Sequence, residues 1–310
     1  MKTRILILLV SLLYGLSVQA GSAALDKKLR LAAANNDMAG VDKALSAGAD
    51  VNSVGQYGNT SLIMAVENGS IAMVAQLLNH GADVNRVSDS GTTAITAAAE
   101  YGYVEILAML LERGADLHVR TRAGWNSLMI AADQGLYDMV DQLIFKGVDP
   151  ENADRKGRTA LMMAAERGHA DVVKLILEKG KADVDARDNK GATALMLAID
   201  AGRGGSVSVL LDGGASVWVV DKEGASALHW AAGNGDKKSV KQLLDHKADP
   251  NVMSDEGITA LMEAVQAGQL DVVRLLLSKG AKTSIKDASG MTAKDHAKKS
   301  GNKSMMAVLK

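Results

Sequence analysis

Residues that could do chemistry are sparse in this 310-residue sequence. Its most glycine-rich stretch, residues 202–206 (Gly-Arg-Gly-Gly-Ser), lacks the lysine and the spacing of a phosphate-binding loop. The absence of cysteine excludes thiolate metal sites and thiol catalysis. The histidines do not recur at the spacing of metal ligands: His80, His118, His169, His229, His246 and His296. We therefore expect no enzyme, no cofactor and no metal site.

Charged and aromatic residues form a clearer pattern. One acidic residue recurs every 33 or 34 positions, at Glu67, Glu100, Asp133, Glu166 and Asp200. Basic residues recur between these positions, at Arg120, Arg122, Arg155, Lys156, Arg158, Arg187, Lys190 and Lys222. Aromatic residues beside charge are favoured at protein–protein interfaces, and Tyr57, Tyr101 and Trp125 lie in the same stretch.

Two interpretations of this pattern remain open. In the first, the charged and aromatic residues bind a partner, and the candidates are Tyr57, Glu67, Glu100, Tyr101, Arg122, Trp125, Asp133, Arg155, Arg158 and Glu166. In the second, the acidic and basic residues only pair with each other and with water, each pair contributing about 0–1 kcal/mol. We favour binding, because the second interpretation gives the aromatic residues no role. Trp218 and Trp230 are instead expected to pack between repeats.

The elements that must position these residues repeat along the chain. A glycine recurs at intervals of 33 residues, with a single interval of 34, at Gly58, Gly91, Gly124, Gly157, Gly191, Gly224, Gly257 and Gly290. A second glycine series keeps the same interval at Gly48, Gly81, Gly114, Gly147, Gly180, Gly214 and Gly280, with Lys247 in one place. A fixed interval of this length predicts a stack of repeated supersecondary units.

Each unit reads as two short helices. A residue that can cap a helix begins the first one, at Thr60, Thr93, Asn126, Thr159, Thr193, Ser226, Thr259 and Thr292. Leucine or isoleucine and then alanine follow on one face, and paired apolar residues such as Leu77-Leu78 mark the second helix. Gly81, Gly114 and Gly180 are predicted to end second helices in the left-handed conformation. The extra Lys181 and the glycines of residues 202–206 predict a soft junction around 181–206.

These units resemble the ankyrin repeat, whose pattern is a turn, Gly-x-Thr-Pro-Leu-His-x-Ala-Ala, a glycine, and a terminal Gly-Ala-Asp-Val-Asn. The resemblance covers nearly all of residues 25–310, although the proline is missing throughout and only residues 226–229 (Ser-Ala-Leu-His) keep the histidine. It implies an all-α solenoid of stacked antiparallel helix pairs with β-hairpin-like loops. It also implies a structural role for His229, and partner binding through the concave groove and the loop tips.

The resulting organisation has four parts. Residues 21–54 form an N-terminal capping repeat and residues 287–310 a C-terminal one. Seven full repeats cover residues 55–286, at 55–87, 88–120, 121–153, 154–187, 188–220, 221–253 and 254–286. Residues 1–20 combine a basic start, a short apolar run and the small residues that a signal peptidase recognises, which predicts a cleavable signal peptide. The alternative, a retained membrane anchor, is disfavoured because the run is shorter than the ~20 apolar residues of a span.

The predicted location is the bacterial periplasm or the exterior, with no membrane insertion after cleavage. Cleavage would remove two of the 35 basic residues and leave the 36 acidic ones, a net charge of about −3, which gives no reason to expect nucleic acid as a partner. We expect a monomer that binds another protein. Narrower hypotheses are an immunity protein against a toxic enzyme or an accessory factor for a periplasmic enzyme. A different class is an envelope scaffold without a single partner.

Overall fold

The computed structural model describes residues 22–309, so the predicted signal peptide lies outside the described residues. The chain divides into two compact units, residues 1–130 and 131–310, and the division falls within α7 (Ser127–Gln134). The described part of unit 1 begins with helical residues 22–34. It continues with α2 (Met38–Ser46), the 3-10 turn η1 (Gln56–Gly58), α3 (Ser61–Glu67), α4 (Ile71–Asn79), α5 (Ala94–Glu100) and α6 (Val104–Glu112).

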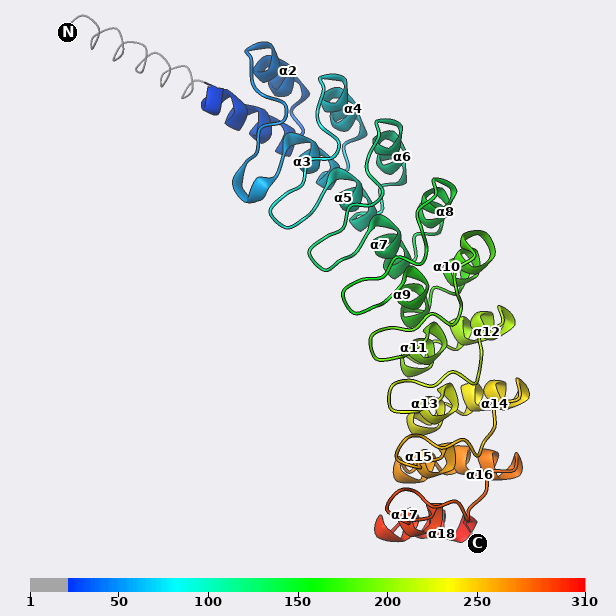
Figure 1. Ribbon diagram of the computed structural model, residues 1–310. Coiled ribbons are helices and arrows are strands. Elements are labelled where there is room, and N and C mark those ends of the chain that lie inside the picture. Colours follow the sequence, from blue (N-terminus) through cyan, green and yellow to red (C-terminus); the bar gives the residue numbers. More distant parts are fainter. Residues whose placement is uncertain (1–21, 310) are drawn as a thin grey trace, which may run out of the picture. The chain divides into compact units, whose positions relative to one another are not determined.

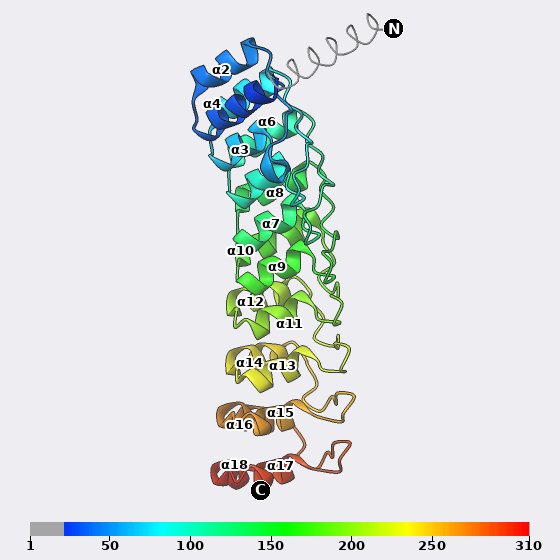
Figure 2. The same cartoon turned by 90° about the vertical axis from the view of Figure 1, so that its left-hand side faces the viewer.

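Unit 2 repeats the same pairing of a first and a second helix. After α7 come α8 (Tyr137–Phe145), α9 (Ala160–Arg167), α10 (Ala170–Leu175), η2 (Ile176–Gly180), α11 (Ala194–Asp200), α12 (Gly204–Asp212), α13 (Ala227–Asn234), α14 (Lys237–Asp245), α15 (Ala260–Gln266), α16 (Leu270–Ser278), α17 (Ala293–Lys299) and α18 (Lys303–Val308). In each unit, successive helix pairs stack on one another (Figure 1). The long loops project from one side of each stack (Figure 2).

The first helix of each repeat begins where the sequence predicts it. Thr60 is extended and accepts a hydrogen bond from the backbone N–H of Ile63, which satisfies a donor at the open helix end. The same bond recurs at Thr93, Asn126, Thr159, Thr193, Thr259 and Thr292. At Ser226 the pattern differs, because its hydroxyl and its backbone N–H both bond to His229 Nδ1. Seven of the eight predicted caps are therefore confirmed in this form.

The first helices form the centre of each stack. In α5, every residue from Ala94 to Ala99 is buried, because helices pack on several sides of it. Alanine at these positions lets neighbouring backbones approach closely, and larger side chains of the second helices, such as Leu77 and Leu110, fill the remaining space. Burial of one leucine side chain contributes about 1.5–3 kcal/mol. The core is thus shared between repeats, and no single repeat encloses its own apolar surface.

Asparagine side chains join successive repeats at their ends. The Asn85 side chain donates to the carbonyl of Gly114 at 3.1 Å and accepts from the backbone N–H of Asp116 at 2.7 Å. Asn52 makes the same two bonds to Gly81 and Asp83. The final residue of the Gly-Ala-Asp-Val-Asn pattern therefore satisfies backbone groups of the next repeat.

The helix end predicted at Gly180 is wrong. Gly81 and Gly114 are left-handed as expected, with φ of 81° and 80°, but Gly180 belongs to the π-helical turn η2. The left-handed residue is instead Lys181, at φ 54°. The inserted residue is therefore accommodated by widening the last helical turn, which moves the chain reversal one position along.

Candidate partner-binding site

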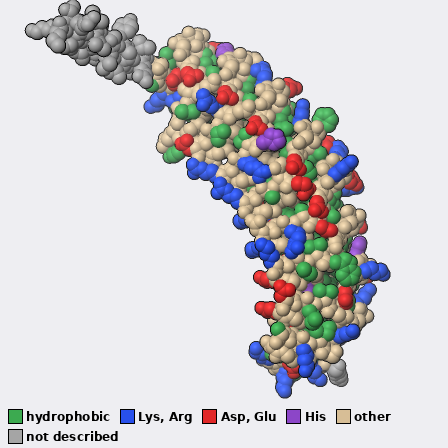
Figure 3. Space-filling model, in the orientation of Figure 1, with side chains coloured by type: hydrophobic (Ala, Val, Ile, Leu, Met, Phe, Trp, Pro, Cys, Tyr) green, Lys and Arg blue, Asp and Glu red, His purple; other side chains and the backbone are tan. Residues whose placement is uncertain are grey.

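Short polar side chains shape the loops that carry the basic residues. Asp154 Oδ1 accepts hydrogen bonds from the backbone N–H groups of Lys156 and Arg158, which folds the loop into a tight turn. The same pair of bonds forms at Asp188, Asp221 and Asp287. Lys and Arg side chains recur along the loop edge in Figure 3. Arg122 and Arg155 are exposed there, as a binding role requires.

Tyr57 is the most unusual of the predicted loop residues. It lies in η1 at φ 64°, a left-handed conformation that is rare for a bulky residue. Its side chain is 69% exposed, so packing does not explain the choice of tyrosine. Its carbonyl accepts a hydrogen bond from the N–H of Asp89 in the next loop at 2.8 Å, and this backbone bond does not require a tyrosine side chain.

The predicted acidic residues of unit 1 end two neighbouring first helices. Glu67 is the last residue of α3 and Glu100 the last of α5, where the helix dipole disfavours negative charge. Partial burial and then the nearby charge of Glu100 raise the pKa of Glu67. Partial burial, followed by the Glu67 and Glu100 charges and Tyr103, also raises the pKa of Tyr101. The negative charges of Glu67 and Glu100 therefore both act on Tyr101.

Tyr103, which was not among the residues predicted from the sequence, lies beside Tyr101. The rings of Tyr101 and Tyr103 stack with centroids 5.9 Å apart and an angle of 11° between their planes. Tyr103 lies over Gly69, where a Cβ atom would approach the ring to 2.6 Å, so glycine is required there. We name Glu67, Glu100, Tyr101 and Tyr103 the tyrosine patch. Residues two apart do not share a face of a helix, so the spacing of Tyr101 and Tyr103 did not predict contact between their rings. The rings meet because the turn between α5 and α6 brings them together.

Two of the three predicted acidic residues of unit 2, Asp133 and Glu166, form ion pairs within the protein, and the third, Asp200, accepts a hydrogen bond from the Asn234 side chain. Asp133 accepts from Arg167 Nε at 2.9 Å. Glu166 lies 3.1 Å from Arg158 Nη1, and the same guanidinium also binds the buried carboxylate of Asp154. Three predicted binding residues thus form ion pairs inside unit 2. Arg158 and Glu166 pair within one repeat, and Asp133 pairs with Arg167 of the next repeat.

The remaining predicted aromatic positions differ in exposure. Trp125 is half-buried, and its backbone forms a closed turn with Thr121 through bonds of 2.8 and 3.2 Å. Trp230 is half-buried and donates to Asp221 at 2.9 Å. The prediction that Trp218 packs between repeats is wrong, because its side chain lies on a loop turn and is 58% exposed. The Trp218 N–H donates to Ser216 Oγ at 3.2 Å within this loop.

His229 has the structural role that the ankyrin resemblance implied. Its Nδ1 accepts from the Ser226 N–H at 3.0 Å, which makes Nε2 the donor to the carbonyl of Ile258 in the next repeat, also at 3.0 Å. Burial is the main cause that lowers the pKa of His229 and keeps the ring neutral. The bond joins two repeats and leaves the imidazole no access to a substrate.

Comparison with known families identifies these repeats. A family described as ankyrin repeats (3 copies) matches residues 29–121, 128–221, 205–287 and 228–309, which together include most of the chain. The chain belongs to the ankyrin-repeat family. This family is a non-enzymatic fold that generally mediates protein–protein interaction.

A solved structure agrees with this assignment. The crystal structure of the ankyrin repeat domain of Bcl-3, described as a unique member of the IkappaB protein family, is similar with a TM-score of 0.64 and 28% sequence identity. The match covers 71% of this chain and 99% of that chain. A search of curated proteins found no match.

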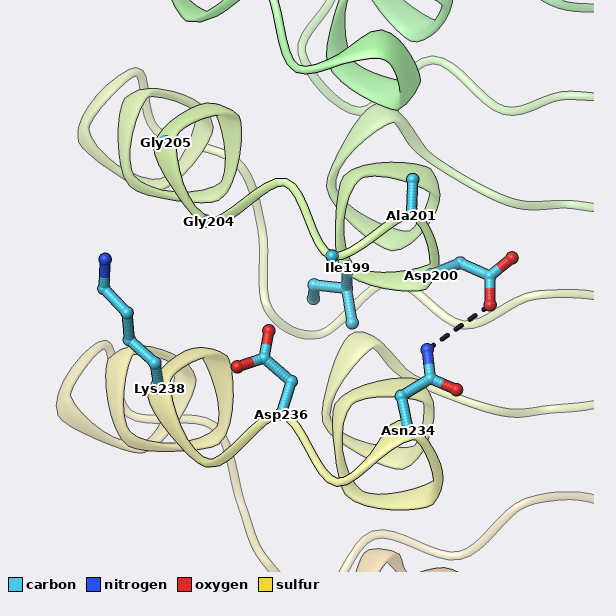
Figure 4. Close-up of a pocket in the computed structure, with 9 residues that line it drawn as sticks. Ile199, Asp200, Ala201, Gly204, Gly205, Asn234, Asp236 and Lys238 are labelled. Carbon is cyan, nitrogen blue, oxygen red and sulfur yellow. Dashed lines mark hydrogen bonds between the residues drawn. The ribbon is translucent and has the colours of Figure 1, made fainter.

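Hollows on this ankyrin-repeat protein are open and shallow. One of about 720 Å3 lies in unit 2 between the turns that precede α12 and α14 (Figure 4). Gly204 and Gly205, which have no side chains, are among the residues that line it. Asp236, Lys238 and the bonded pair Asn234–Asp200 surround it, so it presents both signs of charge.

Residues 22–309 contain no group of three or more His, Asp or Glu side chains placed to hold a metal ion. Within the same range, no helix has the length and apolar character needed to cross a bilayer.

Proposed function

We propose that this protein is an exported, non-catalytic ankyrin-repeat protein that binds another protein through the tyrosine patch and adjoining loop tips of unit 1. The observation that carries the proposal is the contrast within the acidic series. Asp133 and Glu166 bind arginines of their own chain, whereas the described residues include no ion pair to Glu67. Charge retained without such compensation, near the exposed ring of Tyr101, is typical of an interface.

Tyr57 supports the same surface. A glycine would fit its left-handed backbone without strain, yet the chain keeps an exposed tyrosine there. Strain of about 1–3 kcal/mol at such positions is typical of functional sites. Arg122 and Trp125, on another loop of unit 1, are further candidates for contact with the partner. The periplasmic or extracellular location rests on the sequence of residues 1–20.

Affinity capture with a double variant tests this function. In Tyr57→Gly/Tyr101→Ala the main chain keeps its geometry and two exposed rings are removed, so the fold should survive, as checked by thermal unfolding. Capture of partners from the native periplasm, quantified by mass spectrometry, should fall at least tenfold. The matched control Tyr137→Ala/Phe145→Ala removes two exposed rings from α8 and should leave capture unchanged.

The rival functions predict other results. An envelope scaffold would fractionate with the cell wall and would be insensitive to both double variants. If Tyr57→Gly/Tyr101→Ala captures the same proteins in the same amounts as the wild type, the proposed surface is wrong. Identification of the captured protein as a toxin-like enzyme would select the immunity role, and a resident periplasmic enzyme would select the accessory role.

A further inference from the structure

We infer that the tyrosine patch binds an arginine side chain of the partner protein. The inference rests on the proposed function and adds the chemistry of the bound group. It follows from a comparison of unit 1 with unit 2, in which the same repeat position is filled from within the chain.

Unit 2 shows how a guanidinium meets this acidic position. Arg167 lies 34 residues after Asp133 and donates Nε to its carboxylate at 2.9 Å. In unit 1 the residue 34 positions after Glu67 is Tyr101. The carboxylate is thus retained, but the position of the guanidinium is occupied by an exposed ring. A guanidinium supplied by another protein would restore the charge balance that Arg167 provides in unit 2.

The surroundings of Glu67 suit the whole length of an arginine side chain. The stacked rings of Tyr101 and Tyr103 offer an aromatic face, and a cation over such a face gains about 0.5–2 kcal/mol. Beside Tyr103, Ile71 and Val104 line a hollow of about 230 Å3, which can receive aliphatic carbons. Glu100 adds a second negative charge near Glu67.

Arginine fits this combination better than lysine. Its planar guanidinium can stack on a tyrosine ring while its N–H groups bind carboxylate oxygens. A lysine ammonium is a strongly hydrated point charge without a planar face, so it interacts more weakly with the stacked tyrosine rings. A neutral polar side chain would leave the negative charge of Glu67 unchanged.

A titration with a small probe tests the inference without a partner. The chain contains five tyrosines, so labelling of tyrosine rings gives a simple NMR spectrum that Tyr→Phe variants assign. The full-length chain is titrated with N-acetyl-arginine amide, and N-acetyl-citrulline amide serves as the uncharged isostere. The signals of Tyr101 and Tyr103 should shift saturably with arginine, at least fivefold more than with citrulline at equal concentration, while Tyr137 should not move.

Carboxylate variants provide the second arm. Glu67→Gln/Glu100→Gln should remove the arginine-dependent shifts, and Glu112→Gln, an exposed change at the end of α6, should keep them. Equal shifts with citrulline, shifts of Tyr137 as large as those of Tyr101, or full shifts in the double variant would each overturn the inference. If the probe fails while Tyr57→Gly/Tyr101→Ala still abolishes capture, only the arginine assignment is lost. If the probe binds and capture is unaffected, the proposed function is lost.

Discussion

Arg158 Nη1 lies 3.1 Å from Glu166 Oε2, so a predicted loop-tip residue and a predicted acidic residue bind each other in unit 2. Internal pairing, the second interpretation of the charge pattern, therefore describes part of unit 2, and binding through unit 1 remains a proposal. Internal pairing describes Arg158, Glu166 and Asp133. The tyrosine patch of unit 1 keeps the features of a binding surface.

Replacement of Arg158 tests the pairing in unit 2. Arg158→Ala removes the guanidinium from Asp154, whose side chain is only 2% exposed, and from Glu166. Because Asp154 keeps its backbone donors, we expect a loss of about 1–2 kcal/mol in the free energy of unfolding, measured by urea denaturation. Arg155→Ala, an exposed change in the same loop, should stay within about 0.5 kcal/mol. Equal effects of the two variants would show that the pairs contribute nothing.

The ionised side chain of Glu67 should lower the free energy of unfolding at neutral pH. A negative charge at the end of α3 opposes the helix dipole, so Glu67→Gln should raise the free energy of unfolding by about 0.3–1 kcal/mol. Glu105, in the first turn of α6, faces the opposite end of a dipole, so Glu105→Gln should be neutral or slightly destabilising. Thermal unfolding at pH 7 compares the two variants.

The same glutamate predicts a pH dependence of known sign. Since the pKa of Glu67 is raised in the folded state, the folded protein binds this proton more tightly than the unfolded chain does. Its contribution to stability is present below the unfolded pKa of about 4.5 and is lost as the pH rises through the folded pKa. The advantage of Glu67→Gln should therefore be absent at pH 4 and appear by pH 7. An advantage that is constant with pH would contradict this account.

Two lysines occupy positions that favour glycine. Lys181 and Lys247 have φ of 54° and 70°. Lys181→Gly and Lys247→Gly should each stabilise the protein by about 0.5–1 kcal/mol. This figure is the backbone strain that glycine relieves, reduced by the greater conformational entropy of glycine in the unfolded chain. The reverse change, Gly214→Ala at φ 89°, should destabilise it by about 1 kcal/mol. If both variants lose stability, the side chains of Lys181 and Lys247 make contacts that stabilise the protein by more than the strain at these positions destabilises it.

His229 predicts an acid-sensitive contact between repeats. Because burial lowers its pKa, its contribution to stability is present above the unfolded value of 6.5 and is lost as the pH falls through the folded value. Methionine occupies the equivalent position in four other repeats, at Met129, Met162, Met196 and Met262. The stability of His229→Met relative to the wild type should therefore improve between pH 7.5 and pH 5. An unchanged difference across this range would exclude His229 as the sensitive group.

The repeat architecture could be predicted from sequence because its signals are local. Helix caps such as Thr60 and left-handed glycines such as Gly81 act within a few residues of their own position. The widened turn at residues 176–180 could not be predicted, because an inserted lysine can be absorbed in a loop or in a helix. The soft junction expected around residues 181–206 remains a prediction for hydrogen exchange.

The candidate site was predicted less completely. The interval of 33 or 34 residues identified the acidic series, but it could not show that Arg158 and Arg167 neutralise part of that series. Tyr103 had no periodic signal, and its role became visible only when its ring was placed on Gly69 and against Tyr101. Exposure of Trp218 likewise depends on the path of its loop.

Site-specific photocrosslinking of the full-length chain in its native compartment tests the central claim most directly. A benzoylphenylalanine at position 101 should give a covalent adduct whose crosslinked partner peptide contains or adjoins an arginine. The same group at position 145, where Phe145 is 85% exposed on α8, should give no specific adduct. An adduct from position 145 with none from position 101 would contradict the assignment of the partner surface to the tyrosine patch.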